Sequence, residues 1–197
     1  AAQHSQCVEA WCMNMSGIKI VAPTTPYDLK GLLKTAIRDN DPVLFLEHKA
    51  FMAMEGEVPE EEYTIPLGKA NVVKEGKDVT IIALQNLVYQ SLEAAKELEK
   101  EGISVEIIDP RSLIPLDSQT IFNSVKKTGR VVVAHEAPKR GGVGGEIAAL
   151  IAENCFKSLK TPIRRIGALN IPLPFGEPEK YCLPNKDDII RVVKELV

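Results

Sequence analysis

The sequence predicts an α/β protein, with a partial α/β unit followed by a complete α/β sandwich that has a mainly parallel sheet. From about residue 68 to the end, apolar strand-like runs alternate with amphipathic helical segments, the order typical of a parallel sheet covered by helices. Residues 1–50 supply only helix, strand, helix and strand, which makes a sheet too narrow to bury both of its faces. We therefore expect the first unit to be a piece of a larger sheet or to pack on another chain.

Local signals divide the first unit into its elements. Residues 5–13 are predicted to form a short helix capped by Ser5, and an apolar strand follows at 18–22. Thr25 stands before a proline, a pair that favours the start of a helix, and helical spacing continues up to a second strand at 43–47.

The rest of the chain is divided into a linker, 51–67, and a second domain, 68–197. Acidic residues, glycine and proline without periodicity fill 55–62, so we expect an exposed linker. Strands are predicted at 78–83, 104–108, 130–134 and 163–166, and helices at 87–101, 118–127, 146–155 and 187–196.

Composition excludes several functional classes. The 197 residues carry a formal net charge of −3 and no basic run, so no nucleic-acid partner is expected. No apolar stretch approaches the roughly 20 residues of a membrane span. The four cysteines form no C-x-x-C pair and no zinc spacing, and reduced thiols in a cytoplasmic protein are expected.

Three places could carry chemistry. His4 stands before a helix, where an imidazole could titrate near neutral pH, although a surface histidine is the commoner interpretation. His135 and Glu136 end a strand before the glycines of 141–145, which could cradle a phosphate or simply allow a tight turn; the turn is favoured because the spacing matches no phosphate-binding motif. Asp39 and Asp41 flank a helix end and could hold a cation or form a polar turn.

Taken in order, many short segments resemble the beta subunits of the E1 component of thiamine-diphosphate-dependent 2-oxo acid dehydrogenases, with the amino-terminal part missing. The segments are Gln3-His4-Ser5-Gln6, 9–11, 17–23, 26–33, 36–39, 41–43, 46–49, 65–70, 109–113, 115–117, 141–144, 146–147 and 183–184. The wording of 135–142 is similar to acetoin or pyruvate dehydrogenase forms. Each segment is weak alone, but the ordered set covers essentially the whole chain and is specific.

The resemblance implies a transketolase-type architecture. Residues 1–50 would be the carboxyl-terminal part of a pyrimidine-binding domain, and residues 68–197 a transketolase carboxyl-terminal domain. It further implies a heterotetramer with an alpha subunit, a second beta subunit and an E2 acyltransferase as partners. Thiamine diphosphate with Mg²⁺ would lie between alpha and beta, and an acyl group would pass to the E2 lipoyl arm.

The resemblance also assigns site residues. His4 matches the histidine that lines the family's active site, and Ala36, Ile37, Asp39 and Asp41 match a structural potassium site. No residue of this chain matches the glutamate that activates the aminopyrimidine, so no cofactor-binding residue is assigned here. Tyr89 departs from the family pattern, which has a histidine at that position.

Several functions remain open at this stage. The substrate could be pyruvate, acetoin or a branched-chain 2-oxo acid. The chain could instead be an assembly module that docks subunits and E2 without chemistry of its own, or part of a split transketolase. The chain alone is expected to be inactive.

Overall fold

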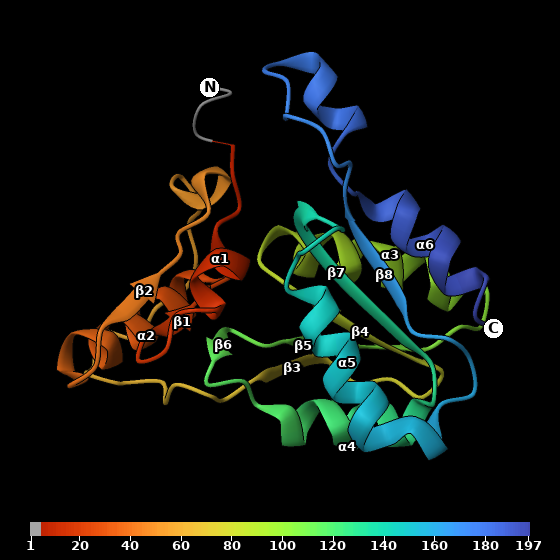
Figure 1. The fold of residues 1–197 in the computed structure, drawn as a ribbon, viewed down its shortest axis with the longest axis horizontal. Coiled ribbons are helices and arrows are strands. Elements are labelled where there is room, and N and C mark those ends of the chain that lie inside the picture. Colours follow the sequence, from red (N-terminus) through yellow and green to blue (C-terminus); the bar gives the residue numbers. More distant parts are fainter. Residues whose placement is uncertain (1–4) are drawn as a thin grey trace.

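The computed structural model describes residues 5–197, which form a three-stranded and a five-stranded sheet (Figure 1). The first unit contains α1 (Glu9–Met13), β1 (Lys19–Val21), α2 (Pro26–Arg38), β2 (Val43–Phe45) and the 3₁₀ turn η2 (Lys49–Phe51). The start of α2 is fixed as predicted, because Thr25 Oγ1 accepts a hydrogen bond from the amide of Asp28 at 3.0 Å.

The second unit alternates strands and helices as predicted. Its elements are β3 (Asn71–Lys74), β4 (Val79–Ala83), α3 (Asn86–Lys100), β5 (Val105–Asp109), β6 (Ser112–Ile114), α4 (Ser118–Thr128), β7 (Val131–Pro138), α5 (Gly144–Cys155), η3 (Phe156–Ser158), β8 (Arg164–Ala168), η4 (Glu177–Tyr181) and α6 (Lys186–Lys194). Its sheet has the order β3-β5-β4-β7-β8, in which β3 alone runs antiparallel to its neighbour.

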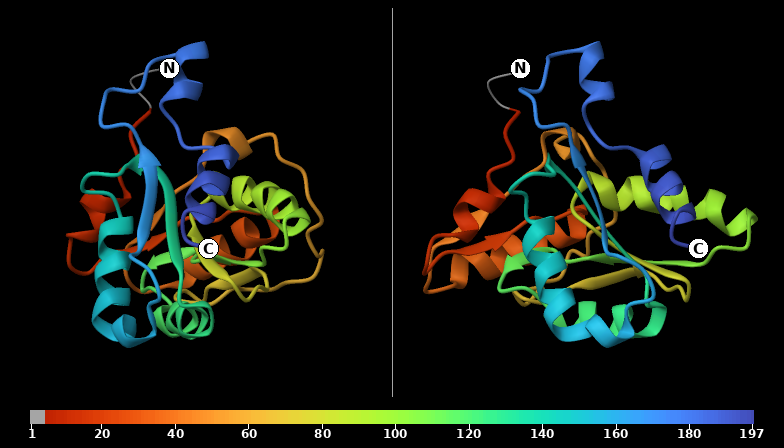
Figure 2. Two further views of the ribbon diagram at one scale, coloured as in Figure 1. Left: turned by 90° about the vertical axis from the view of Figure 1, so that its right-hand side faces the viewer. Right: turned by 45° about the vertical axis from the view of Figure 1, so that its right-hand side comes forward.

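Helices cover both faces of this sheet (Figures 1 and 2). Helices α3 and α6 pack on one face and α4 and α5 on the other. Neighbouring residues of β4 therefore serve different layers: Ile81 packs in the first and Ile82 in the second, and both are fully buried. A strand buried on both faces has an unbroken apolar sequence, and this pattern allows such strands to be predicted from the sequence.

Three local predictions need correction. Helix α1 begins at Glu9, and its N-cap position is Val8 without a side-chain capping bond, so Ser5 does not cap it. Strand β7 extends to Pro138, which places His135 and Glu136 inside the strand. Strands β3 and β6 were not predicted, because runs of three or four residues carry too little periodicity to be recognised.

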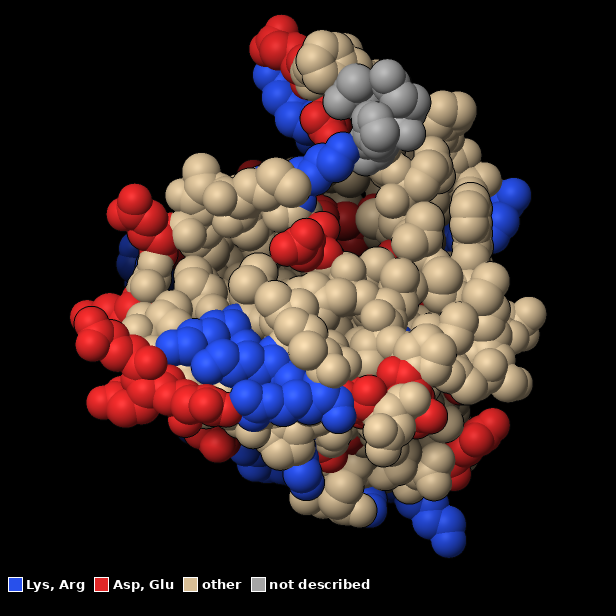
Figure 3. Space-filling view, turned by 90° about the vertical axis from the view of Figure 1, so that its left-hand side faces the viewer, with Lys and Arg blue, Asp and Glu red and all other residues tan. Residues whose placement is uncertain are grey.

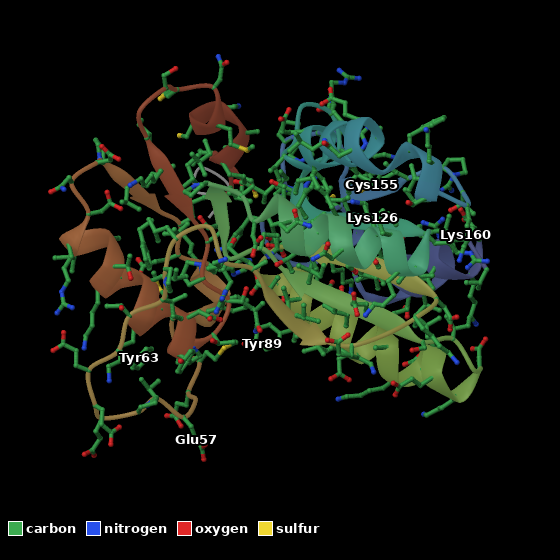
Figure 4. The ribbon with its side chains drawn as sticks, turned by 90° about the horizontal axis from the view of Figure 1, so that it is seen from below. Glu57, Tyr63, Tyr89, Lys126, Cys155 and Lys160 are labelled. Carbon is green, nitrogen blue, oxygen red and sulfur yellow. The ribbon has the colours of Figure 1, made fainter. Side chains whose placement is uncertain are left out.

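The linker is exposed along much of its length but tied to α2. The ring of Tyr63 stacks on Tyr27 with centroids 4.5 Å apart, and its hydroxyl donates to the Tyr27 carbonyl at 2.8 Å. The amide of Ile65 donates to the Gly31 carbonyl at 3.2 Å, and a Cβ on Gly31 would lie 2.6 Å from the Ile65 side chain. Figure 4 shows Glu57 and Tyr63 on this loop. A glycine in α2 thus allows the close approach of the linker.

Strand β6 joins the two units. It pairs antiparallel with β1, so the first sheet has the order β2-β1-β6 and takes its third strand from the second unit. The core is continuous across this pairing: Ile20 of β1 packs with Ile108, Leu113 and Val143 of the second unit. The narrow sheet expected from residues 1–50 is widened by residues of the same chain.

Arg111 makes the crossing between β5 and β6 possible. Its backbone is left-handed, with φ 55°. Its carbonyl accepts from the amide of Ala22 at 2.8 Å, and its guanidinium lies 2.9 Å from Asp28 of α2. The same guanidinium donates to the carbonyl of Lys69 at 2.9 and 3.1 Å. One residue thereby fastens β1, α2 and the end of the linker.

Asp109 lies beside this crossing and is almost fully buried. The pKa of its carboxyl is raised to about 7, mainly by burial and also by the charge of Asp28, although the Arg111 amide at 2.9 Å acts in the opposite direction. The crossing therefore concentrates one cation and two carboxyl groups in a space with little solvent.

Removal of the Arg111 guanidinium should destabilise the whole fold. In the Arg111→Met variant the free energy of unfolding is expected to fall by about 3–5 kcal/mol, because Asp28 is left as a buried, unpaired carboxylate. Urea denaturation followed by circular dichroism measures this change. Arg38→Met is the matched control, because its ion pair with Glu62 is exposed on both sides and should contribute little. An Arg111→Met protein as stable as this control would contradict the assignment.

Candidate functional site

A cluster of polar side chains lies at the carboxyl edge of the second sheet. From β4 the chain first adds β5 on one side and later β7 on the other, so β4 and β7 flank the topological switch point where α/β proteins bind ligands. Asn86, just after β4, donates from Nδ2 to Oε1 of Glu136 on β7 at 2.9 Å.

His48 of the first unit completes this cluster. Its Nε2 lies 2.5 Å from Oε2 of Glu136, and its Nδ1 accepts from the amide of Ala50 at 3.2 Å. A nitrogen that accepts from an amide carries no proton, so the hydrogen of the neutral ring is on Nε2 and points at the carboxylate. Burial alone would raise the pKa of Glu136, but the hydrogen bonds from His48 and Asn86 outweigh it and lower that pKa.

Residues that follow His4 in sequence lie near the same carboxylate. The pKa of the Cys7 thiol is raised to about 12, mainly by burial and also by the charges of Glu9 and Glu136. Burial also raises the pKa of Glu9, with a further contribution from Glu136. Cys7 is therefore a protonated thiol at neutral pH, unsuited to act as a nucleophile.

A series of ring contacts runs from His48 of the first unit to Tyr89 of the second. The His48 and Phe51 rings stack at 4.6 Å, and Phe51 meets Tyr89 of α3 edge-on at 5.4 Å. The hydroxyl of Tyr89 lies 3.2 Å from both the Thr24 carbonyl and Met54 Sδ. Figure 4 shows Tyr89 between the two units. This gives Tyr89, whose role the sequence left open, a place in the contact between them.

A cavity of about 330 Å³ opens beside this series. It lies beyond the carboxyl ends of β1 and β2, and its walls include Thr24, Leu29, His48, Phe51 and Met54. The volume is in the range of small-molecule sites, and apolar walls with few polar groups are typical of them. All of the lining residues lie within 23–54, so the cavity is a candidate ligand site formed by the first unit and the start of the linker.

His135 and the glycines after it form a packing unit. The imidazole is fully buried, with Nδ1 3.0 Å from the Ala137 carbonyl, and burial lowers its pKa to about 4. A Cβ on Gly142 would lie 2.5 Å from its ring, and one on Gly144 would lie 2.7 Å from Nε2. Of the two interpretations of this segment, the tight turn fits: the glycines provide the space for a histidine ring, which the sequence did not indicate.

The helix-end residues are also brought together. The ammonium of Lys19 lies 2.7 Å from Asp39 and 3.0 Å from Asp41, and hydrogen bonding to Lys19 lowers the pKa of Asp39. The carbonyl of Ala36 accepts from the Asp39 amide at 3.3 Å. The carboxylates are therefore engaged with an ammonium, and within residues 5–197 no three acidic, histidine or cysteine side chains gather as metal ligands.

Charge is mixed on the face that Figure 3 shows, where a group of basic side chains is flanked on both sides by acidic ones. A field of one sign, which a polyanion such as nucleic acid needs, is absent from the described part of this face. No helix within residues 5–197 has both the length and the apolar character needed to cross a membrane.

Comparison with known proteins identifies the family. Residues 68–189 match the model of the transketolase C-terminal domain, and residues 1–53 match that of the transketolase pyrimidine-binding domain. The chain belongs to the transketolase family.

The relatives of this transketolase-family chain are E1 beta subunits. It is 47% identical over 195 residues to the pyruvate dehydrogenase E1 component subunit beta of Bacillus subtilis, and 49% identical over 193 residues to that of Staphylococcus aureus. It is 46% identical to the 2-oxoisovalerate dehydrogenase subunit beta of Bacillus subtilis. These alignments cover 98–100% of the chain and 59–61% of the relatives, so the chain spans about 60% of their length.

Solved structures agree with the fold. A split-gene transketolase, described as an inactive beta4 tetramer, superposes with a TM-score of 0.81 at 30% identity, over 99% of this chain and 62% of its own. A Pichia stipitis transketolase superposes with a TM-score of 0.65 over 99% of this chain and 27% of its own; at 13% identity it supports the fold alone. The predicted fold class and the resemblance to E1 beta subunits are confirmed.

The transketolase-family assignment leaves the individual site residues as predictions. His4 lies outside the described residues. Sequence reasoning did not find the cluster of His48, Asn86 and Glu136, because its members are far apart in the chain. The one available signal was the position of Glu136 near the carboxyl end of a buried strand.

The space that Gly142 and Gly144 leave for the His135 ring can be tested with neighbouring substitutions. Gly144→Ala is expected to lower the free energy of unfolding by about 1–3 kcal/mol, because the new methyl group would overlap His135 Nε2. Gly145→Ala is the control: its nearest neighbour would be Arg165 at 3.5 Å, and alanine favours the helix. Thermal unfolding of the two variants measures the difference. Equal stabilities would show that His135 does not need a glycine at position 144.

Proposed function

We propose that the chain acts as part of a beta subunit of a thiamine-diphosphate-dependent 2-oxo acid dehydrogenase E1, with pyruvate, acetoin or a branched-chain 2-oxo acid as substrate. The observation that carries the proposal is the 46–49% identity to E1 beta subunits over almost the whole chain. The 30% identity to a split transketolase makes that alternative weaker.

The proposed reaction needs groups from several chains. Thiamine diphosphate, when bound, would supply the chemistry for carbon–carbon cleavage of the substrate, and an E2 lipoyl group would accept the acyl product. We assign the Mg²⁺-diphosphate site to an E1 alpha subunit, as the resemblance implies. This chain would contribute His4 for proton transfer. A second beta subunit would complete the assembly in the cytoplasm.

A second candidate role, docking without chemistry, is favoured by one surface feature. The segment around η4 stands away from both sheets (Figures 1 and 2), and Phe175 and Tyr181 on it are about 75% exposed. Exposed aromatic side chains are typical of protein–protein interfaces. This role is compatible with the first, because one subunit can both dock E2 and take part in catalysis.

The two roles separate by experiment. Calorimetric titration of the isolated chain with thiamine diphosphate and Mg²⁺ is expected to show no micromolar binding, and assay of the same chain to show no turnover. In the full-length subunit assembled with alpha, His4→Ala should lower turnover by about 100-fold or more, the usual contribution of a proton-transfer group. Capture of E2 should be unchanged by that substitution.

Other outcomes would redirect the assignment. Micromolar cofactor binding by the isolated chain would refute the proposal that the cofactor site needs groups from other chains. Full activity of the His4→Ala assembly would show that His4 takes no part in the mechanism. Docking would then be the remaining proposed role of this chain.

We also propose a potassium site at Ala36, Ile37, Asp39 and Asp41, as the resemblance implies. Because Lys19 engages both carboxylates, the main-chain carbonyls at the end of α2 are the better donors for a monovalent cation. Binding to the folded state alone should raise the midpoint of thermal unfolding by several degrees in potassium chloride over choline chloride of equal ionic strength. Equal midpoints in the two salts would count against the site.

A further inference from the structure

The switch point of the second sheet is occupied by the protein itself. In an open α/β sheet this position is where a ligand normally meets the carboxyl ends of the strands. Here the two groups that face it, Asn86 and Glu136, are taken up by each other and by His48, a residue of the first unit. We term the polar side-chain atoms of Asn86 and Glu136 the carboxylate socket.

The contact between His48 and the socket has the features of a bound ligand. Only 19% of the His48 side chain and 13% of the Glu136 side chain is exposed. Both ring nitrogens have a partner, Glu136 at 2.5 Å and the Ala50 amide at 3.2 Å. A hydrogen bond to an ionised acceptor in a low-dielectric place is one of the stronger polar contacts in proteins. No such contact is needed to hold the strands, which pair through their backbones.

What His48 holds in place is η2. This turn begins directly after His48 and carries Phe51, whose ring stacks on the imidazole and meets Tyr89. His48 and Phe51 both line the cavity at the carboxyl ends of β1 and β2. The socket therefore determines the shape of one wall of that cavity through a single imidazole ring.

We propose that His48 is a positioning residue that acts as a built-in ligand: its imidazole binds the carboxylate socket and thereby fixes η2 and the cavity wall. The imidazole has a polar contact with Glu136, a second with the Ala50 amide, and a stacked ring in Phe51. These groups should also accept free imidazole when the His48 side chain is removed. Glu136, held in place by Asn86, is then specific for a neutral nitrogen heterocycle that donates one hydrogen bond.

The test is chemical rescue of the 197-residue chain by imidazole. The midpoint of thermal unfolding of His48→Ala should fall by about 3–10 °C, and exchange of the Ala50 amide with solvent should accelerate about 2- to 10-fold. Imidazole at roughly 10–50 mM and pH about 8, where the ring is neutral, should recover at least half of both losses.

Two controls make the rescue specific. The double variant His48→Ala with Glu136→Gln should show no recovery, because the charged acceptor of the ring is gone. Phe51→Ala should be destabilised by lost stacking but should not respond to imidazole, since its own His48 still fills the socket. No cofactor or substrate is used, so the outcome is independent of the proposed dehydrogenase role.

Three results would overturn the proposal. They are wild-type stability and exchange in His48→Ala, no response of that variant to imidazole, or equal recovery in the double variant. If His48→Ala does not fold, His48→Gln replaces it, because an amide can still donate to Glu136. The proposal then predicts that the Asn86 side-chain amide exchanges with solvent at the wild-type rate and that the Ala50 backbone amide exchanges faster. The reverse pattern contradicts it.

Discussion

The left-handed backbone of Arg111 is the constraint on which the rest of the structure depends. It turns the chain between β5 and β6 so that β6 leaves one sheet and enters the other. The same residue pairs with Asp28 in a nearly solvent-free contact. A non-glycine residue in this conformation is costly and persists only where its surroundings hold it. Here the cost is offset by a continuous core, in which Ile20 of the first unit packs among side chains of the second.

This junction explains why the carboxyl edge of the second sheet is closed. Four side chains reach from it to the first unit: Gln85 to the Leu46 carbonyl at 2.8 Å, Tyr89 to Thr24, Arg111 to Asp28, and Glu136 to His48. Gln85, like Arg111, has a positive φ, of 46°. The edge that commonly binds a ligand in α/β domains binds the other unit instead. A cavity of about 330 Å³ lies at the carboxyl ends of β1 and β2.

The limits of sequence reasoning follow from the range of each interaction. Helix starts such as Thr25-Pro26 and the buried strand at 131–133 were predictable, because local capping and unbroken apolarity determine them. Strand β6 was not, since it exists only by pairing with β1, more than 90 residues earlier. The family resemblance supplied His4 and the helix-end residues, but the contact of His48 with Glu136 spans 88 positions and has no sequence signature.

The central claim is that the two units open as one cooperative structure because β6 and Arg111 belong to both. Native-state hydrogen exchange in increasing urea measures this most directly. The Ala22 amide, bonded to Arg111, should share its opening free energy and urea dependence with the Thr80 amide, bonded to Arg130 in the second sheet. An Ala22 amide that opens at clearly lower free energy, while Thr80 stays protected, would contradict the account.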